Sequence, residues 1–223
     1  MDAKGQHSDL HLNLASLRKE YTRDGLSEAQ ADLNPIRQFE AWFQQAQAAG
    51  LGEPNAMVLA TADRKGIPST RVVLLKEISE DGFAFYTNYL SRKGRELAEN
   101  PNASVTFPWV ELERQVCIVG SVQKLPRANS EAYFKVRPRG SQLGAWVSQQ
   151  STVIPGRGFL EKRLRELEQQ HAHSDIPLPP NWGGYLLVPS QIEFWQGRPN
   201  RLHDRLLYSR QSDATWKLER LSP

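Results

Sequence analysis

The sequence predicts a mainly β fold, an antiparallel barrel with helices around it. From residue 56 onward, short apolar or β-branched segments alternate with turn residues, which is typical of antiparallel strands joined by tight connections. Helical periodicity is confined to a few segments before and between these strands. No internal repeat and no long linker divides the barrel, so we expect one domain over residues 31–223, preceded by a mobile arm over residues 1–30.

The composition argues against several classes of protein. With 39% hydrophobic and 24% charged residues, the 223-residue chain has an ordinary globular mix. Its net charge is only +3 and its arginines are scattered, whereas a nucleic-acid-binding protein more often carries a dense basic stripe. No apolar run is long enough to span a membrane, and the first residues lack the apolar core of a secretory signal. Cys117 is the only cysteine, which fits a cytoplasmic protein and a core position for this side chain.

The first regular element is expected to be a helix that begins after Asn34. This residue suits the N-cap and Pro35 suits the first helical position. An apolar face then recurs at helical spacing, and Gly50 is placed to end the helix. The residues of that face are Ile36, Phe39, Trp42, Phe43 and Ala46.

The following region is expected to be an antiparallel meander and its continuation. The meander strands cover residues 56–61, 69–78 and 83–87. A short helix begins after Ser91, and two further strands, over residues 103–107 and 115–123, extend the sheet. Gly120 lies inside the last of these strands, which indicates a bulge or a close backbone approach.

The rest of the chain is expected to be helical first and then β again. Expected helices begin at residue 129 or 130 and cover residues 141–150 and 159–170. Prolines 177, 179 and 180 end the helical pattern. Four short strands are expected around residues 185–188, 191–196, 202–208 and 215–221.

Candidate chemistry has to rest on side chains, because the usual backbone motifs are missing. The sequence contains no glycine-rich phosphate loop, no Gly-x-Gly-x-x-Gly after a strand and no His-Glu-x-x-His. Four of the five histidines lie in polar segments, so a zinc site would have few ligands and we expect no metal.

Arg201, His203 and Arg205 form the most informative group. In a strand, alternate side chains share a face, which would place these three together and turn Leu202 and Leu206 toward the core. Positive groups side by side repel one another unless an anion or water offsets them. The alternative is an ordinary solvated face of the barrel.

A second group lies at the start of the helix after Ser91. Arg92, Lys93 and Arg95 fall in its first turn, where the helix dipole disfavours cations. A bound phosphate would reverse that preference, since backbone N–H groups and cations would all point at it. The alternative is that the long side chains extend into water.

Three further features have two readings each. Tyr133 and Arg137 are four residues apart and close to Ser141, which suits a phosphomonoester or, equally, a helix end with cations at its negative terminus. The strand between Arg71 and Lys76 has a charge at each end. It is either an ordinary barrel strand with charged ends or a strand whose two charged side chains contact two groups of a ligand. Trp195 suits either packing or the cover of a planar ring.

Together these segments resemble the pyridoxamine 5′-phosphate oxidase family. The most specific match is residues 195–205, WQGRPNRLHDR, and the matches run in family order from about residue 18 to the C-terminal end. The other matching segments are residues 71–76 (RVVLLK), 85–88 (FYTN), 91–93 (SRK), 113–116 (ERQV) and 137–146 (RPRGSQLGAW).

The resemblance implies an FMN-binding split β-barrel, antiparallel and Greek-key-like with peripheral helices, assembled as a homodimer with FMN at the subunit interface. It implies an oxidase that converts pyridoxamine 5′-phosphate and pyridoxine 5′-phosphate to pyridoxal 5′-phosphate, reducing O2 to hydrogen peroxide and releasing ammonia from the amine. The alternative is a related split-barrel flavin oxidase that acts on another cyclic metabolite. Neither a nucleic acid nor a membrane is expected as a partner.

The resemblance also assigns residues. The implied FMN contacts are Arg71, Val72, Val73, Leu74, Leu75, Lys76, Tyr86, Thr87, Arg92, Lys93, Gln115, Gln150, Ser151, Trp195 and Arg205. The implied substrate contacts are Arg18, Lys19, Glu20, Tyr21, Lys76, Tyr133, Arg137, Ser141, Arg201, Leu202 and His203. Arg201 and His203 are the implied catalytic residues, and residues 18–21 resemble a segment that closes over the substrate. Two departures are a lysine at position 19, where arginine is usual, and Pro155-Gly156 in a stretch that is usually serine-rich.

Overall fold

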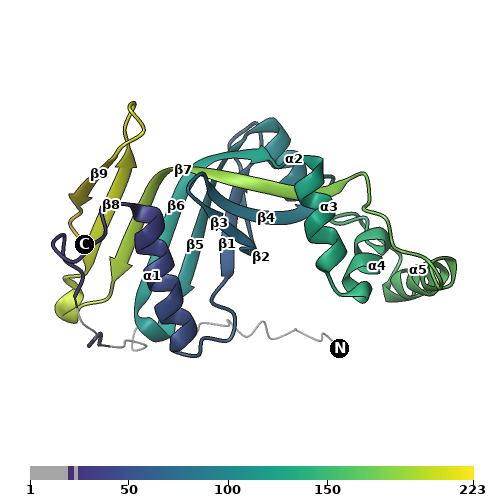
Figure 1. Cartoon of the computed structure of the whole chain (residues 1–223), viewed down its shortest axis with the longest axis horizontal. Helices are drawn as coiled ribbons and strands as arrows, with labels where there is room; N and C mark the ends of the chain where they lie inside the picture. The colour runs from purple at the N-terminus through teal and green to yellow at the C-terminus, as the bar shows by residue number, and fades with distance from the viewer. Residues whose placement is uncertain (1–19, 23–24) are drawn as a thin grey trace, which may run out of the picture.

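The computed structural model describes residues 20–22 and 25–223, and its main feature is one curled, wholly antiparallel sheet (Figure 1). Seven strands follow the order β2-β1-β5-β6-β7-β4-β3, and β8 and β9 extend the sheet from β7. The strands are β1 (Ala56–Ala62), β2 (Pro68–Leu74), β3 (Glu77–Ser79), β4 (Gly82–Asn88), β5 (Asn102–Trp109), β6 (Arg114–Lys124), β7 (Trp182–Gln196), β8 (Asp204–Arg210) and β9 (Trp216–Arg220).

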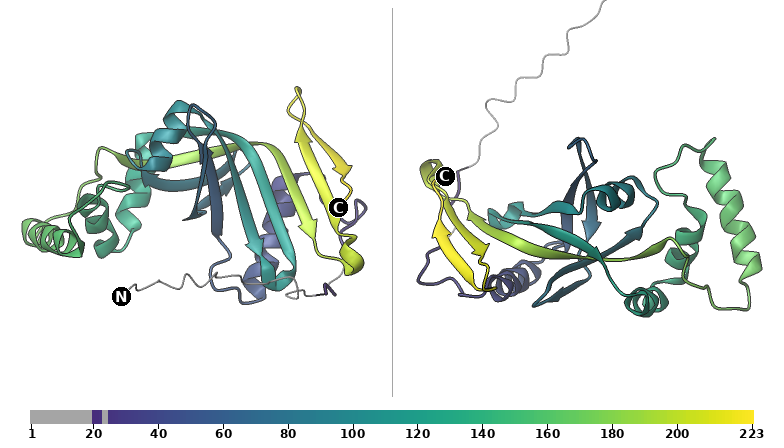
Figure 2. Two further views of the ribbon diagram at one scale, coloured as in Figure 1. Left: turned by 180° about the vertical axis from the view of Figure 1, so that it is seen from behind. Right: turned by 90° about the horizontal axis from the view of Figure 1, so that it is seen from above.

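Five α-helices lie around this sheet, as expected for a mainly β fold with flanking helices. They are α1 (Pro35–Ala48), α2 (Arg92–Glu99), α3 (Arg127–Val136), α4 (Arg139–Val147) and α5 (Arg157–Gln170), and two short 3₁₀ turns cover Val110–Leu112 and Pro199–Arg201. The α3–α5 helices gather at one end of the long axis, and β8 and β9 lie at the other end in all three views (Figures 1 and 2).

The first helix confirms the expected capping. The Asn34 side chain accepts hydrogen bonds from the N–H groups of Ile36 and Arg37, and Gly50 follows the helix with φ +74°. The expected apolar face packs on the sheet, with Phe39 at the centre of an aromatic core that includes Phe83 and Phe107.

The expected meander over residues 56–88 is wrong. The β1–β2 and β3–β4 hairpins lie at opposite ends of the strand order, because the strand expected over residues 69–78 is interrupted at residues 75 and 76. The Leu75 side chain enters the core and its N–H donates to Asn55 O, whereas the Lys76 N–H donates to Ala84 O. The two residues therefore transfer the chain from one edge of the sheet to the other.

The later elements differ from expectation mainly at their ends. Helices α3, α4 and α5 each begin about two residues early, and α4 ends at Val147 rather than at residue 150. The two strands expected between residues 185 and 196 are one long strand, β7. The bulge expected at Gly120 is confirmed: the register with β7 shifts there, and a Cβ would lie 2.0 Å from Val188 O.

Candidate active site

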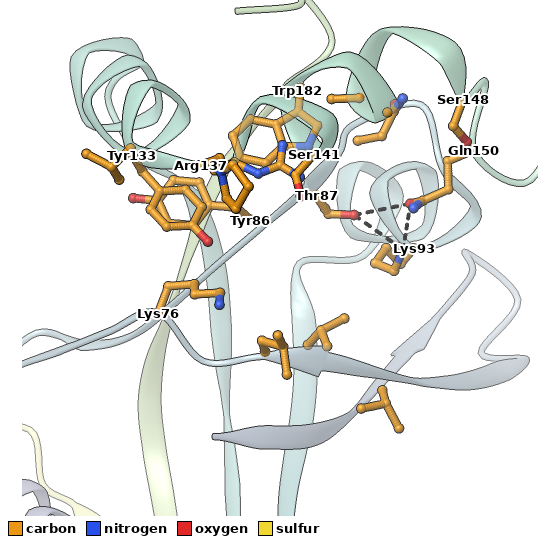
Figure 3. Close-up of a pocket in the computed structure, with 18 residues that line it drawn as sticks. Lys76, Tyr86, Thr87, Lys93, Tyr133, Arg137, Ser141, Ser148, Gln150 and Trp182 are labelled. Atoms are coloured by element: carbon orange, nitrogen blue, oxygen red, sulfur yellow. Dashed lines mark hydrogen bonds between the residues drawn. The ribbon is translucent and has the colours of Figure 1, made fainter. Parts of the chain in front are cut away.

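A cavity of about 630 Å³ lies between β2, β4 and the α3–α4 pair, within the size range of small-molecule sites (Figure 3). We call it the cationic pocket. Its lining carries three cations and no carboxylate among the described residues, so its field favours an anion. The lining residues are Val72, Val73, Leu74, Lys76, Tyr86, Thr87, Asn88, Lys93, Tyr133, Val136, Arg137, Pro138, Ser141, Gly144, Ala145, Ser148, Gln150 and Trp182.

Lys93 forms one positive end of the cationic pocket. It lies in the first turn of α2, which Ser91 caps by accepting a hydrogen bond from the Gly94 N–H, as the sequence predicts. The side chain is buried, and its Nζ lies 2.9 Å from Gln150 Oε1 and 3.3 Å from Thr87 Oγ1. Burial and then the nearby Arg71 charge lower the Lys93 pKa to about 8. An anion beside it would restore the charged form.

Behind Lys93, the carboxylate of Glu96 holds two arginines. Glu96 is only 5% exposed and accepts hydrogen bonds from Thr61 and Ser69. Its oxygens pair with Arg71 Nη2 at 3.3 Å and with Arg92 Nε at 2.7 Å. Although burial opposes ionisation, these donors together lower the Glu96 pKa to about 2. Neither arginine lines the cavity, so both predicted contacts sit one layer behind it.

Arg137 forms the other positive end. The residue is the C-cap of α3 rather than part of the helix, and its guanidinium lies over the Trp182 ring at 4.6 Å. Its Nη1 is buried and has no hydrogen-bond partner, which is costly for a charged donor. Burial also lowers the Arg137 pKa. The same space is lined by Tyr133, Ser141 and Lys76 (Figure 3). An anion bound at this end would therefore accept hydrogen bonds from the unpartnered Arg137 Nη1 and from its neighbours.

Aromatic rings form the floor between the two ends. Tyr86 and Tyr133 stack at 4.1 Å between centroids, and Tyr86 also stacks on Trp182 at 5.6 Å. Sequence reasoning missed Trp182, Asn88 and Ser148. The glycines after Trp182 were the available signal, because a Cβ on Gly184 would lie 2.8 Å from the Tyr86 ring.

A second group of predicted residues, the C-terminal cluster, lies at adjoining ends of β6, β7 and β8 and in the segments beside them. We define it as Tyr21, Gln115, Trp195, Arg201, His203 and Arg205. In the sheet register, Trp195 is opposite both Gln115 and Arg205. Arg205 makes two bonds to Glu193, at 2.8 and 3.1 Å, so its charge is already compensated.

Three rings meet in the C-terminal cluster. The Trp195 and His203 rings lie 4.6 Å apart, and the Tyr21 ring stands edge-on to both, at 5.7 and 5.5 Å. His203 Nδ1 accepts the Arg198 N–H at 3.1 Å, so the neutral ring carries its proton on Nε2. Burial and then the nearby Arg201 charge lower the His203 pKa, which keeps the ring neutral near pH 7.

The strand expected over residues 202–208 is wrong at its start. The β8 strand begins at Asp204, and residues 199–201 form a 3₁₀ turn in which Asn200 and Arg201 have φ of 55° and 63°. Arg201 therefore does not share a strand face with Arg205. Leu202, expected to point to the core, is 70% exposed, whereas Leu206 is buried as expected. Two adjacent non-glycine residues with positive φ are strained, a feature that often marks functional sites.

The structure thus brings the predicted residues together in two places rather than one. The cationic pocket lies beside α3 and α4, and the C-terminal cluster lies around the start of β8. These helices and this strand are at opposite ends of the molecule (Figure 1). The Leu75 side chain is in the core and Ser151 is exposed with φ 71°. Arg18 and Lys19 lie outside the described residues, and Glu20 is exposed. Cys117 is half-buried rather than in the core, with a hydrogen bond from Gln115.

No helix in residues 20–22 and 25–223 is both long and apolar enough to cross a bilayer. In the same residues, no three His, Cys, Asp or Glu side chains are grouped in a way that would hold a metal ion.

Comparison with known proteins finds one family over almost the whole length. The family described as pyridoxamine 5′-phosphate oxidase matches residues 43–171, and the pyridoxine 5′-phosphate oxidase C-terminal dimerisation region matches residues 182–223. The pyridoxine/pyridoxamine 5′-phosphate oxidase of Nostoc punctiforme is 58% identical over 94% of this chain and 98% of its own. The protein of the same name from Paraburkholderia phytofirmans is 56% identical over 95% of this chain and 99% of its own.

Solved structures show the same fold. PhzG from Burkholderia lata, in complex with tetrahydrophenazine-1-carboxylic acid, superposes with a TM-score of 0.84 at 33% identity over 90% of this chain and 98% of its own. A pyridoxamine 5′-phosphate oxidase-related FMN-binding protein from Nostoc punctiforme has a TM-score of 0.69 at 21% identity over 86% of this chain and all of its own. The sheet described above is therefore a split β-barrel.

Proposed function

The chain belongs to the pyridoxamine 5′-phosphate oxidase family, and from this premise we propose how its two groups of residues perform the reaction. The protein is an FMN-dependent oxidase that converts pyridoxamine 5′-phosphate and pyridoxine 5′-phosphate to pyridoxal 5′-phosphate. O2 is reduced to hydrogen peroxide, and the amine substrate also releases ammonia after hydrolysis of its imine. The observation that carries the proposal is the cationic pocket, with two separate positive ends in one cavity.

The Arg137 end fits the phosphate of the substrate. An unpartnered, buried guanidinium nitrogen is a donor that a phosphate oxygen would satisfy. The Tyr133 and Ser141 hydroxyls supply neutral donors, and Lys76 adds a second positive charge. Trp182 lies under the guanidinium and limits its movement. This set favours a phosphorylated vitamer over its free alcohol or amine.

The Lys93 end fits the phosphate of FMN. Lys93, Arg71 and Arg92 outnumber the single Glu96 carboxylate, so the local charge suits a phosphate dianion. Thr87, Gln150 and the backbone N–H groups at the start of α2 add neutral donors. Val72, Val73 and Leu74 lie between the ends as an apolar wall for a planar ring.

The C-terminal cluster of the partner subunit completes each site. One small ligand cannot contact groups at opposite ends of one folded subunit, but a twofold dimer can bring the pocket of one protomer to the cluster of the other. Exposed apolar side chains at both places support this arrangement: Val72 and Val136 line the pocket, and Leu202 lies between Arg201 and His203. The family's dimerisation region, residues 182–223, contains Trp195, Arg201, His203 and Arg205 of that cluster. We propose residues 31–223 as one domain and residues 1–30 as an arm.

Bound FMN supplies the two-electron acceptor of the reaction. The protein's residues orient the substrate and manage its protons. We assign Arg201 and His203 to the substrate ring, where the Nε2–H of neutral His203 donates to a ring substituent. Trp195 and Tyr21 exclude water beside that ring. We also propose a cytoplasmic location, which the single cysteine supports.

A split-barrel oxidase for another cyclic metabolite is the competing function, and PhzG is the relevant relative. This chain is 33% identical to PhzG and 58% identical to the Nostoc punctiforme oxidase. The Arg137 end of this chain suits a substrate that carries a phosphate, which supports the phosphorylated vitamers.

The test is spectroscopic. We expect the purified protein to be yellow, to bleach on adding pyridoxamine 5′-phosphate without air, and to recover its colour with O2. A colourless protein that does not bind added FMN would contradict the cofactor, and a yellow protein that does not bleach would contradict the substrate.

A further inference from the structure

The side chain of Tyr21 packs against the other rings of the C-terminal cluster, although Tyr21 lies in no helix or strand. Its ring touches Trp195 and His203 and lies so close to Gly197 that a Cβ there would be 2.7 Å from the ring. A tyrosine outside the regular elements needs fixed neighbours to keep such a position, because the backbone of a free segment loses entropy when it is ordered.

The first of these neighbours is Glu113. It is 4% exposed, and its Oε2 accepts the Thr22 N–H at 3.0 Å. The same residue accepts the Gly197 N–H at its carbonyl oxygen, at 2.7 Å. Glu113 therefore holds two backbone groups: that of Thr22, which follows Tyr21, and that of Gly197, which lies under the Tyr21 ring. Its φ of 56° is unusual for glutamate, which indicates that the turn is specified by these contacts.

The second neighbour is Asp204, next to His203 in sequence. Its Oδ2 accepts the Leu26 N–H at 3.0 Å, and its Oδ1 pairs with Arg220 Nη1 at 2.7 Å. Arg220 in turn donates to Leu26 O and pairs with Glu28. The Leu26 side chain is buried in the main core. The backbone at Leu26, five residues after Tyr21, is therefore tied to the start of β8.

We infer that Glu113 and Asp204 are positioning residues of the reaction. They act through Tyr21, by fixing the backbone at two points that follow it, Thr22 and Leu26, so that its ring covers Trp195 and His203. The inference rests on the proposed function, in which these rings border the substrate. Two carboxylates suit the task, because a charged acceptor holds a backbone N–H more strongly than a neutral one. Neither residue contacts the reacting atoms.

The test is a double-mutant cycle with Tyr21→Ala. In the wild-type background, Glu113→Ala and Asp204→Ala should each lower kcat/KM for pyridoxine 5′-phosphate about 10-fold, as expected for the loss of one charge-assisted hydrogen bond. FMN affinity should stay as in the wild type. In the Tyr21→Ala background, the same changes should have almost no further effect, since their target is gone. Full 10-fold effects in both backgrounds would overturn the inference, as would no effect in either.

Conservative variants separate geometry from charge. Glu113→Gln and Asp204→Asn keep an acceptor oxygen, so they should recover most of the lost kcat/KM. If Asp204→Asn is as impaired as Asp204→Ala, the carboxylate acts through its charge on His203 and the inference fails for that residue. Glu219→Gln, which removes only the exposed Lys217–Glu219 pair on β9, is the matched control and should match the wild type.

Hydrogen exchange gives a readout that does not need turnover. The Thr22 and Leu26 amides should exchange about 10-fold faster in Glu113→Ala and Asp204→Ala, respectively, while amides of β6 and β7 keep their protection. Unchanged exchange at both amides contradicts the inference even if the wild type turns over. A wild type that binds FMN but does not oxidise either vitamer contradicts the proposed function instead, and exchange still tests whether the carboxylates hold the segment.

Discussion

The cationic pocket and the C-terminal cluster differ in how far their polar groups are satisfied. In the pocket, Arg137 has a buried nitrogen without a partner and Lys93 has a lowered pKa, so both groups would gain from an anion. In the cluster, Arg205 is paired with Glu193 and the His203 Nδ1 is occupied by a backbone N–H. The pocket is thus built to bind charge, and the cluster to present rings and one oriented imidazole. We propose that each forms half of an active site.

The largest expected effect tests the catalytic side of this comparison. Arg201→Leu should lower turnover about 1,000-fold, because positioning and proton transfer at the substrate typically contribute two to four orders of magnitude. FMN binding should be unchanged, since the phosphate-binding end belongs to the pocket. Steady-state oxidation of pyridoxine 5′-phosphate and the visible spectrum measure the two quantities. Wild-type turnover in this variant would refute the role of Arg201.

The next effect tests the binding side. Arg137→Met should raise KM for pyridoxine 5′-phosphate about 30-fold, as expected for the loss of a charged hydrogen-bond donor. The kcat should change much less, because the phosphate is bound equally in the ground and transition states. Pyridoxine without a phosphate serves as the control, and its KM should hardly change. A loss of kcat with KM unchanged would show that Arg137 acts on the chemistry instead.

The smallest effect tests the Lys93 end through pH. The Lys93 pKa is about 8, so the ammonium is charged at pH 7 and largely neutral at pH 9. The dissociation constant of FMN should therefore rise about tenfold between these pH values, by linkage. Riboflavin, which lacks the phosphate, should bind with little dependence on pH in this range. Lys93→Met should bind FMN more weakly and remove the dependence, and a variant that keeps the full dependence would exclude Lys93 as its cause.

The same comparison explains what could be predicted from the sequence. Most pocket residues lie on helices and strands, whose residue spacing is visible in the local sequence. Ser91 caps α2 and so places Lys93, and the sequence predicts both. The pairing of the strands is harder to predict from the sequence. Residues 69–78 read as one strand, but the break at Leu75 depends on contacts with Asn55 and Ala84, which are distant in sequence.

The C-terminal cluster shows the opposite case. The family resemblance of the segment around Arg201 is confirmed, but the expected geometry is wrong, because alternation of side chains assumes extended backbone. Asn200 and Arg201 have positive φ, and nothing in local propensity predicts a left-handed arginine. Glu113 and Asp204 fall in segments that resemble the family, but nothing in the sequence pattern indicates that their carboxylates accept the Thr22 and Leu26 N–H groups.

The central claim is that every active site combines the pocket of one chain with the cluster of the other. Mixed dimers of Arg137→Met and Arg201→Leu test it directly, because each mixed dimer would contain one site with both halves intact. With random mixing, half of the dimers are mixed, so activity measured with substrate well below KM should recover to about a quarter of the wild-type value, whereas the Arg137→Met dimer alone should keep only about a thirtieth. Activity no higher than that of the separate variants, in dimers shown by differently tagged chains to be mixed, would contradict the claim.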